Sequence, residues 1–129
     1  MRITLRDLMA ESGVAFGTSG ARGLASAMTD RVCFAYAKGF LQYLETAAGY
    51  QGPGRAVAIA GDIRPSTGRI MEAVARAAES AGCEAVHCGR IPSPAVALFG
   101  LERGIPAIMV TGSHIPDDRN GIKFNKPTG

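Results

Sequence analysis

Apolar residues between about residues 29 and 48 recur every three or four positions, which is the period of one face of an α-helix. The residues that carry this period are Val32, Tyr36, Phe40, Tyr43 and Leu44. We expect Thr29 to cap this helix at its N-terminus and Gly49 to end it. A shorter amphipathic turn is predicted over residues 4–12.

From residue 55 onward, short apolar runs alternate with helical patterns. Strands are predicted over 55–60, 83–88 and 105–110 and near 121–125, and helices over 66–81, opened by Ser66, and 93–102, capped by Ser93. Runs that are apolar throughout are typical of parallel strands buried on both faces, and this spacing indicates parallel crossovers. The pattern predicts an α/β fold, a three-layer α/β/α domain with a mostly parallel, mixed sheet.

Glycine recurs at every third position from 17 to 23, in the run Phe-Gly-Thr-Ser-Gly-Ala-Arg-Gly that starts at Phe16. This spacing predicts that residues 16–23 have no regular structure. Free backbone amides together with the Arg22 guanidinium suit a phosphate. The run is neither a Walker loop nor a dinucleotide fingerprint, and a plain linker is the alternative.

Polar residues follow the predicted parallel strands, in the segments 61–64, 88–90 and 111–114. Ligands of open parallel sheets bind beyond the carboxyl ends of the strands, so these segments mark one candidate edge. A structural domain also has polar loops there. Asp62 and Arg64 have a second interpretation, in which they brace the helix that follows them.

Residues 111–123 form the segment richest in reactive side chains. Ser113 follows a glycine at a strand end, where backbone amides can form an anion-binding nest. His114 can polarise a neighbouring group, and Lys123 can point back at the serine. The alternative is a solvated turn. A serine hydrolase is disfavoured, because Ile115 stands where the nucleophile elbow G-x-S-x-G needs glycine.

The composition of the 129 residues is that of one globular domain, with 47% hydrophobic and 19% charged residues. The net charge of +3 comes from scattered basic residues, aromatics are 6%, and tryptophan is absent. A dedicated nucleic-acid binder is therefore not expected, whereas a few anion-binding arginines are. No apolar run is long enough for a transmembrane helix, so we expect no membrane partner.

The three cysteines and the acidic residues near the N-terminus indicate a cytoplasmic protein with reduced thiols. Cys83, His87 and Cys88 lie close together in sequence, which raises the possibility of a metal site. On a strand, however, Cys83 and Cys88 point to opposite faces. We therefore interpret both as structural residues.

Taken together, these segments resemble the α-D-phosphohexomutase family, which includes phosphomannomutases and phosphoglucomutases. The resemblance rests on Phe16–Gly23, on Gly61–Ser66, on the Pro-Ser-Pro run that begins at Pro92, and on residues 111–123, which resemble T-[AG]-S-H-N-P-x-x-x-N-G-x-K. It implies the fold of the family's first, phosphoserine-bearing domain over residues 1–129. Two positions depart from the family pattern: Ile115 replaces an asparagine, and Gly61 replaces an arginine found in many relatives.

The resemblance also implies roles for individual residues. It implies that Ser113 carries the exchangeable phosphoryl group and, once phosphorylated, contacts Mg²⁺. Lys123 would help to move the proton of the sugar hydroxyl, while His114 and Arg22 would complete the catalytic set. The phosphate-binding residues implied are Thr18, Ser19, Arg22, Arg64 and Asn120.

The activity implied is that of an isomerase that interconverts hexose 6-phosphate and hexose 1-phosphate through a bisphosphorylated sugar, with hexose 1,6-bisphosphate as activator. The family has four domains, and its metal motif D-x-D-x-D is absent from these 129 residues. We therefore expect a chain truncated at its C-terminus, which needs the remaining domains as partners and is inactive alone. The alternatives are a non-catalytic phosphosugar- or anion-binding module and a purely structural domain.

Overall fold

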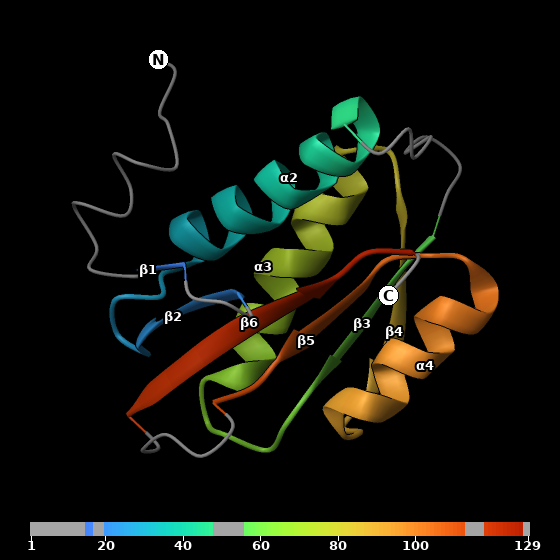
Figure 1. Ribbon diagram of the computed structural model, residues 1–129. Helices are drawn as coiled ribbons and strands as arrows, with labels where there is room; N and C mark the ends of the chain where they lie inside the picture. The colour runs from blue at the N-terminus through green and yellow to red at the C-terminus, as the bar shows by residue number, and fades with distance from the viewer. Residues whose placement is uncertain (1–14, 17–19, 48–55, 113–117, 128–129) are drawn as a thin grey trace.

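A computed structural model describes residues 15–16, 20–47, 56–112 and 118–127 (Figure 1). Its elements, in chain order, are β1 (Ala15–Phe16), β2 (Gly20–Leu24), α2 (Asp30–Ala47), β3 (Ala56–Gly61), α3 (Thr67–Ser80), β4 (Glu84–Gly89), α4 (Ser93–Arg103), β5 (Ala107–Val110) and β6 (Arg119–Asn125). The amphipathic turn expected over residues 4–12 and the helix end expected at Gly49 lie outside the described residues.

All six strands form one mixed sheet, in the order β1-β2-β6-β5-β3-β4. β3 pairs in parallel with β4 and with β5, so α3 and α4 are the parallel crossovers that the sequence predicts. β6 runs antiparallel to β5 and to β2, and β2 runs antiparallel to β1. The predicted three-layer α/β/α fold with a mixed sheet is therefore confirmed, with α2 and α3 on one face and α4 on the other (Figure 1). The expectation of a mostly parallel sheet is wrong, because only two of the five pairings between described strands are parallel.

The core has two parts because β3, which lies between β5 and β4, is apolar on both faces. Val57 and Ile59 belong to the larger cluster, which packs against α2 and α3. Ala58 and Ala60 belong to the smaller cluster, which packs against α4. Cys83 lies in the larger cluster and Cys88 packs against the smaller one, so their predicted placement on opposite faces is confirmed.

The helices begin and pack as their sequences indicate, with three differences. Tyr43, predicted to lie on the apolar face of the helix over 29–48, is 52% exposed. The Thr29 Oγ1 accepts a hydrogen bond of 3.3 Å from the Val32 amide, which confirms the predicted cap of α2. Ser66 precedes α3 without capping it through its side chain, and Pro92 rather than Ser93 is the N-cap of α4. The apolar stripe of α3 is buried at Ile70, Val74, Ala77 and Ala78.

The prediction that residues 16–23 lack regular structure is wrong, because Gly20–Leu24 form β2. Glycine serves close packing here. Gly20 has a φ of 141°, and a Cβ at this position would lie 1.9 Å from the Ile122 carbonyl oxygen of β6. The missing side chain therefore lets two strands meet where any other residue would separate them.

Among the described residues, no helix is both long and apolar enough to cross a membrane.

Candidate functional site

Among the described residues, α4 is the helix on one face of the sheet. It packs over β3 and β5, and its principal contacts do not extend to β2 and β6. β2 and β6 carry the glycine-rich run and the end of the segment 111–123. The face formed by β2 and β6 on the α4 side is called the open face below.

The strand register places Arg22 and Lys123 together on the open face. Arg22 of β2 is paired with Gly121, and Lys123 of β6 is paired with Gly20. Residues directly opposite each other, and residues two apart on a strand, point to the same side of a sheet. Lys123 is also paired with Met109, which belongs to the smaller cluster on the α4 side.

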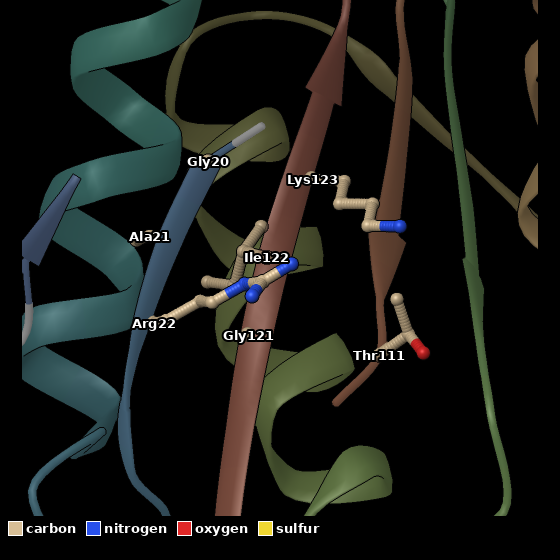
Figure 2. Close-up of a pocket in the computed structure, with 7 residues that line it drawn as sticks. All are labelled: Gly20, Ala21, Arg22, Thr111, Gly121, Ile122 and Lys123. Atoms are coloured by element: carbon tan, nitrogen blue, oxygen red, sulfur yellow. The ribbon is translucent and has the colours of Figure 1, made fainter. Parts of the chain in front are cut away.

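A small pocket lies between these side chains and the end of β5. Figure 2 shows the Arg22 side chain extending across β6, and the Lys123 side chain directed toward β5. The pocket is lined by Gly20, Ala21, Arg22, Thr111, Gly121, Ile122 and Lys123. The two glycines leave space beside the two cations, which is an arrangement that can hold an anion with several oxygens.

The pocket is positively charged. Arg22 is exposed and Lys123 is half-buried, and neither forms an ion pair with another described residue. Arg119, opposite Leu24 in the same register, adds a third cation to the open face. Arg119 is not among the site residues predicted from the sequence, because the last strand is predicted to lie near 121–125. A strand start at 119 would have placed Arg119, Gly121 and Lys123 on one face.

Asp62 connects the ends of two parallel strands, β3 and β5. Its carboxylate accepts hydrogen bonds from the Thr67 hydroxyl (2.5 Å), the Arg64 amide (3.1 Å) and the Arg64 Nε (3.2 Å). It also accepts bonds from the Thr111 hydroxyl (3.0 Å) and the Gly112 amide (3.1 Å). The predicted gathering of polar residues at this edge is thus confirmed for the segment 61–64 and for the described residues of 111–114.

The charge state of Asp62 follows from these contacts. Burial on its own would raise the pKa of the Asp62 carboxyl. The hydrogen bonds that it accepts from Thr67, Arg64, Gly112 and Thr111 outweigh burial, and the pKa lies below its ordinary value. Asp62 is therefore a carboxylate at neutral pH, fixed by its donors and by the ion pair with Arg64.

Arg64 lies in the turn that follows β3 and is nearly buried, with its side chain 10% exposed. Besides its contacts with Asp62, its Nη1 donates to the Arg119 carbonyl oxygen at 3.4 Å. Its guanidinium lies so close to Gly112 that a Cβ there would be 2.2 Å from the Arg64 Cζ. Arg64 therefore packs between the turn and the two strand ends, and is not one of the residues lining the pocket with Arg22 and Lys123.

Asn120 is fully buried, and both polar atoms of its side-chain amide form hydrogen bonds. Its Nδ2 donates to the Ser66 Oγ at 2.8 Å and to the Thr67 Oγ1 at 3.1 Å. Its Oδ1 accepts a bond of 2.8 Å from the Gly121 amide. The structure thus places Asn120 beneath the open face, away from the pocket lining.

The other predicted site residues, Thr18, Ser19, Ser113 and His114, lie outside the described residues, as does Ile115. Gly61 is buried, and a Cβ here would lie 2.5 Å from the Thr67 Cγ2 and 2.6 Å from the Met71 Sδ. A side chain at position 61 would therefore point into the contact between β3 and α3. Close packing of β3 against α3 therefore explains why position 61, which departs from the family pattern, holds a glycine.

The described residues on their own do not fit a divalent cation. They contain no group of three or more His, Cys, Asp or Glu side chains that could hold one. Asp62, which directly follows β3, already accepts five hydrogen bonds. A Mg²⁺ ion would need ligands beyond this part of the chain.

Comparisons with known proteins agree with this architecture. Residues 13–129 match the family described as phosphoglucomutase/phosphomannomutase, alpha/beta/alpha domain I. A phosphomannomutase of Salmonella muenchen is 44% identical over 123 residues, which are 95% of this chain and 25% of the relative. A phosphoglucosamine mutase of Mycobacterium ulcerans is 37% identical over 120 residues, or 91% of this chain and 26% of the relative.

A solved structure is similar over nearly the whole chain. The crystal structure of a phosphoglucomutase/phosphomannomutase family protein from Burkholderia thailandensis matches with a TM-score of 0.69 and 27% identity, covering 99% of this chain and 27% of that one. The chain thus spans about a quarter of the length of the relatives that it matches.

Proposed function

This chain belongs to the phosphoglucomutase/phosphomannomutase family, as its α/β/α domain I, and on that premise we propose that it is the phosphoserine-bearing domain of a phosphohexomutase. The observation that carries the proposal is the pairing of Arg22 with Gly121 and of Lys123 with Gly20. This register brings two cations from opposite ends of the sequence to one face, next to the strand that leads into Ser113.

In the proposed reaction, Ser113 transfers a phosphoryl group to a hydroxyl of a hexose phosphate. The P–O bond between phosphorus and the serine oxygen breaks as a P–O bond to the sugar forms, and Lys123 helps to move the proton of the sugar hydroxyl to the serine oxygen that leaves. The bisphosphorylated sugar reorients, and its other phosphate returns to Ser113, which completes an isomerisation. His114 would polarise a group beside the serine.

The charges of the open face suit this chemistry. A phosphoserine carries about −1.5 to −2 charges at neutral pH. Phosphoryl transfer depends mainly on positioning and on neutralising charge, so cations on one rigid sheet face are the main contribution that the protein can make. We assign this contribution to Arg22 and Lys123. Thr18, Ser19 and Arg64 remain proposed phosphate-site residues from the family resemblance. Asn120, whose buried side chain already bonds Ser66, Thr67 and Gly121, would serve that site by positioning β6.

Mg²⁺ and a hexose 1,6-bisphosphate activator belong to the same proposal. Mg²⁺ would supply further neutralisation of the phosphate charge, with phosphorylated Ser113 as the one ligand that this chain offers. The three free cysteines favour the cytoplasm as the location of the protein.

The test is a coupled mutase assay on the full-length protein that carries this chain, with a hexose 1-phosphate, Mg²⁺ and the bisphosphate. We expect Ser113→Ala to abolish turnover, and Arg22→Ala and Lys123→Ala each to lower kcat by roughly 10²–10³. Lys38→Ala is the matched control, because this lysine binds Ser80 between α2 and α3, far from the pocket.

Near-normal activity of Arg22→Ala would contradict the assignment of the open face. Binding of the hexose phosphate by the wild type with no turnover would favour the alternative, a non-catalytic anion-binding module. Turnover by residues 1–129 alone would contradict the proposed need for further domains.

A further inference from the structure

The segment that connects β5 to β6 has both of its described ends bonded to one turn. This turn, Asp62–Thr67, follows β3 and leads into α3. At the entry to the segment, Asp62 accepts hydrogen bonds from the Thr111 hydroxyl (3.0 Å) and the Gly112 amide (3.1 Å). These partners are about fifty positions away in sequence, so the contacts do more than cap a helix.

At the exit from the segment, the side-chain Nδ2 of Asn120 donates to the Ser66 Oγ (2.8 Å) and to the Thr67 Oγ1 (3.1 Å). The Thr67 hydroxyl in turn donates to the Asp62 carboxylate at 2.5 Å. Asn120, Thr67 and Asp62 therefore form a continuous chain of hydrogen bonds from the start of β6 to the end of β5.

Burial makes this network stiff. Thr67 and Asn120 are fully buried, and Thr111 is 8% exposed. A buried polar group that loses its partner is costly, so each member holds the next in one position. The Arg64 Nη1, which donates to the Arg119 carbonyl oxygen at 3.4 Å, adds a second tie to the exit strand.

We propose that Asp62, Thr67 and Asn120 are positioning residues that fix the distance between the peptide leading into Ser113 and the strand that carries Lys123. The inference rests on the proposed function and deepens it. Gly112 is bonded covalently to Ser113, and Asn120 lies three residues before Lys123 on β6. Because phosphoryl transfer is sensitive to misplacement, with about 1 Å costing roughly 10²-fold, the network controls the rate without touching the substrate.

The decisive variant is Thr67→Val, which replaces the linking hydroxyl by a methyl group of similar size. In the full-length protein we expect kcat per folded molecule to fall by roughly 10–10², with the KM for the hexose phosphate changed less than about threefold. The amides of Gly112 and Gly121 should exchange with solvent faster. Thr67→Ser keeps the hydroxyl, so its kcat and its amide protection should both stay close to those of the wild type.

Two further variants complete the design. Ser66→Ala removes only one of the two acceptors of the Asn120 amide, and should lower kcat several-fold even if Thr67→Val does not fold. Asp30→Asn is the matched control, since Asp30 is also paired with arginines, Arg69 and Arg76, but lies at the start of α2. We expect its kcat to equal that of the wild type.

A merely architectural network would lower the melting temperature of Thr67→Val and Ser66→Ala while leaving kcat per folded molecule unchanged. That result, alongside an inactive Ser113→Ala, would overturn the positioning role and leave the proposed function standing. Equal activity of the wild type and Ser113→Ala would overturn both.

Discussion

Gly61→Ala is the substitution whose effect on stability the structure defines most sharply. Gly61 ends β3, immediately before Asp62. The added Cβ would lie 2.5 Å from the Thr67 Cγ2 and 2.6 Å from the Met71 Sδ. Met71 is unbranched and can move aside. Thr67 cannot move without loosening its hydrogen bonds to Asp62 and Asn120, so the methyl group must be accommodated against a fixed neighbour.

The expected loss of stability follows from three contributions. Overpacking by one methyl group in a well-packed core costs about 1–3 kcal/mol. Displacing Thr67 weakens hydrogen bonds with a net contribution of ~1 kcal/mol each. Replacing glycine reduces the entropy of the unfolded chain and returns about 0.4–1 kcal/mol. The net effect is a destabilisation of about 2 kcal/mol, or a fall in Tm of roughly 8 °C for a domain of this size.

The assay is urea denaturation of the 129-residue chain followed by far-UV circular dichroism, with Gly68→Ala as the control. Gly68 lies in the first turn of α3, and a Cβ there would approach only the flexible Arg90 side chain, at 3.3 Å from its Nη2. Alanine has a higher helix propensity than glycine, so this control variant should be as stable as the wild type or more stable by up to about 1 kcal/mol. Equal stability of Gly61→Ala and wild type would refute the tight contact between β3 and α3.

Three other outcomes are expected. Gly20→Ala should destabilise the chain by more than about 2 kcal/mol in the same assay, because its Cβ would meet the backbone of Ile122 at 1.9 Å. A loss of stability below ~0.5 kcal/mol would argue against the β2–β6 pairing. Burial raises the pKa of the Cys33 thiol to about 12, so alkylation at pH 8 should modify the half-buried Cys88 well before Cys33, as measured by peptide mass spectrometry. The reverse order of modification would contradict the packing of α2. The pKa of Asp62 is lowered in the folded state, so its contribution to stability is present above its ordinary pKa and is lost as pH falls through the folded value. Acid titration of Asp62→Asn should therefore lack part of the stability loss that the wild type shows below about pH 4, and identical titration curves would speak against the network.

The elements between residues 56 and 110 are predictable from the sequence because their signals are local. β3 is identified by a short continuous apolar run, and α3 by an apolar stripe that repeats at helical spacing. β2 is not predictable in this way. Its glycines have low strand propensity, and the strand exists because it pairs with β6, about a hundred residues later in the sequence.

Individual residues of the candidate site are predictable from the sequence, whereas their arrangement is not. Arg22 and Lys123 are identifiable as candidates from the motifs around them. Their meeting on one face depends on the β2–β6 register, which is set by long-range contacts. The local sequence does not predict the hydrogen bonds of Asn120 with Ser66 and Thr67 either. It does not distinguish a buried asparagine from an exposed asparagine that binds phosphate.

The most direct test of the account is the location of phosphate on the protein. The full-length protein that carries this chain is incubated with a hexose 1,6-bisphosphate and Mg²⁺, and its phosphate is mapped by intact mass and by peptide mass spectrometry. The account predicts one phosphate, on Ser113, which is lost when excess hexose monophosphate is added. Stable phosphate on another serine, with Ser113 unmodified, would contradict it.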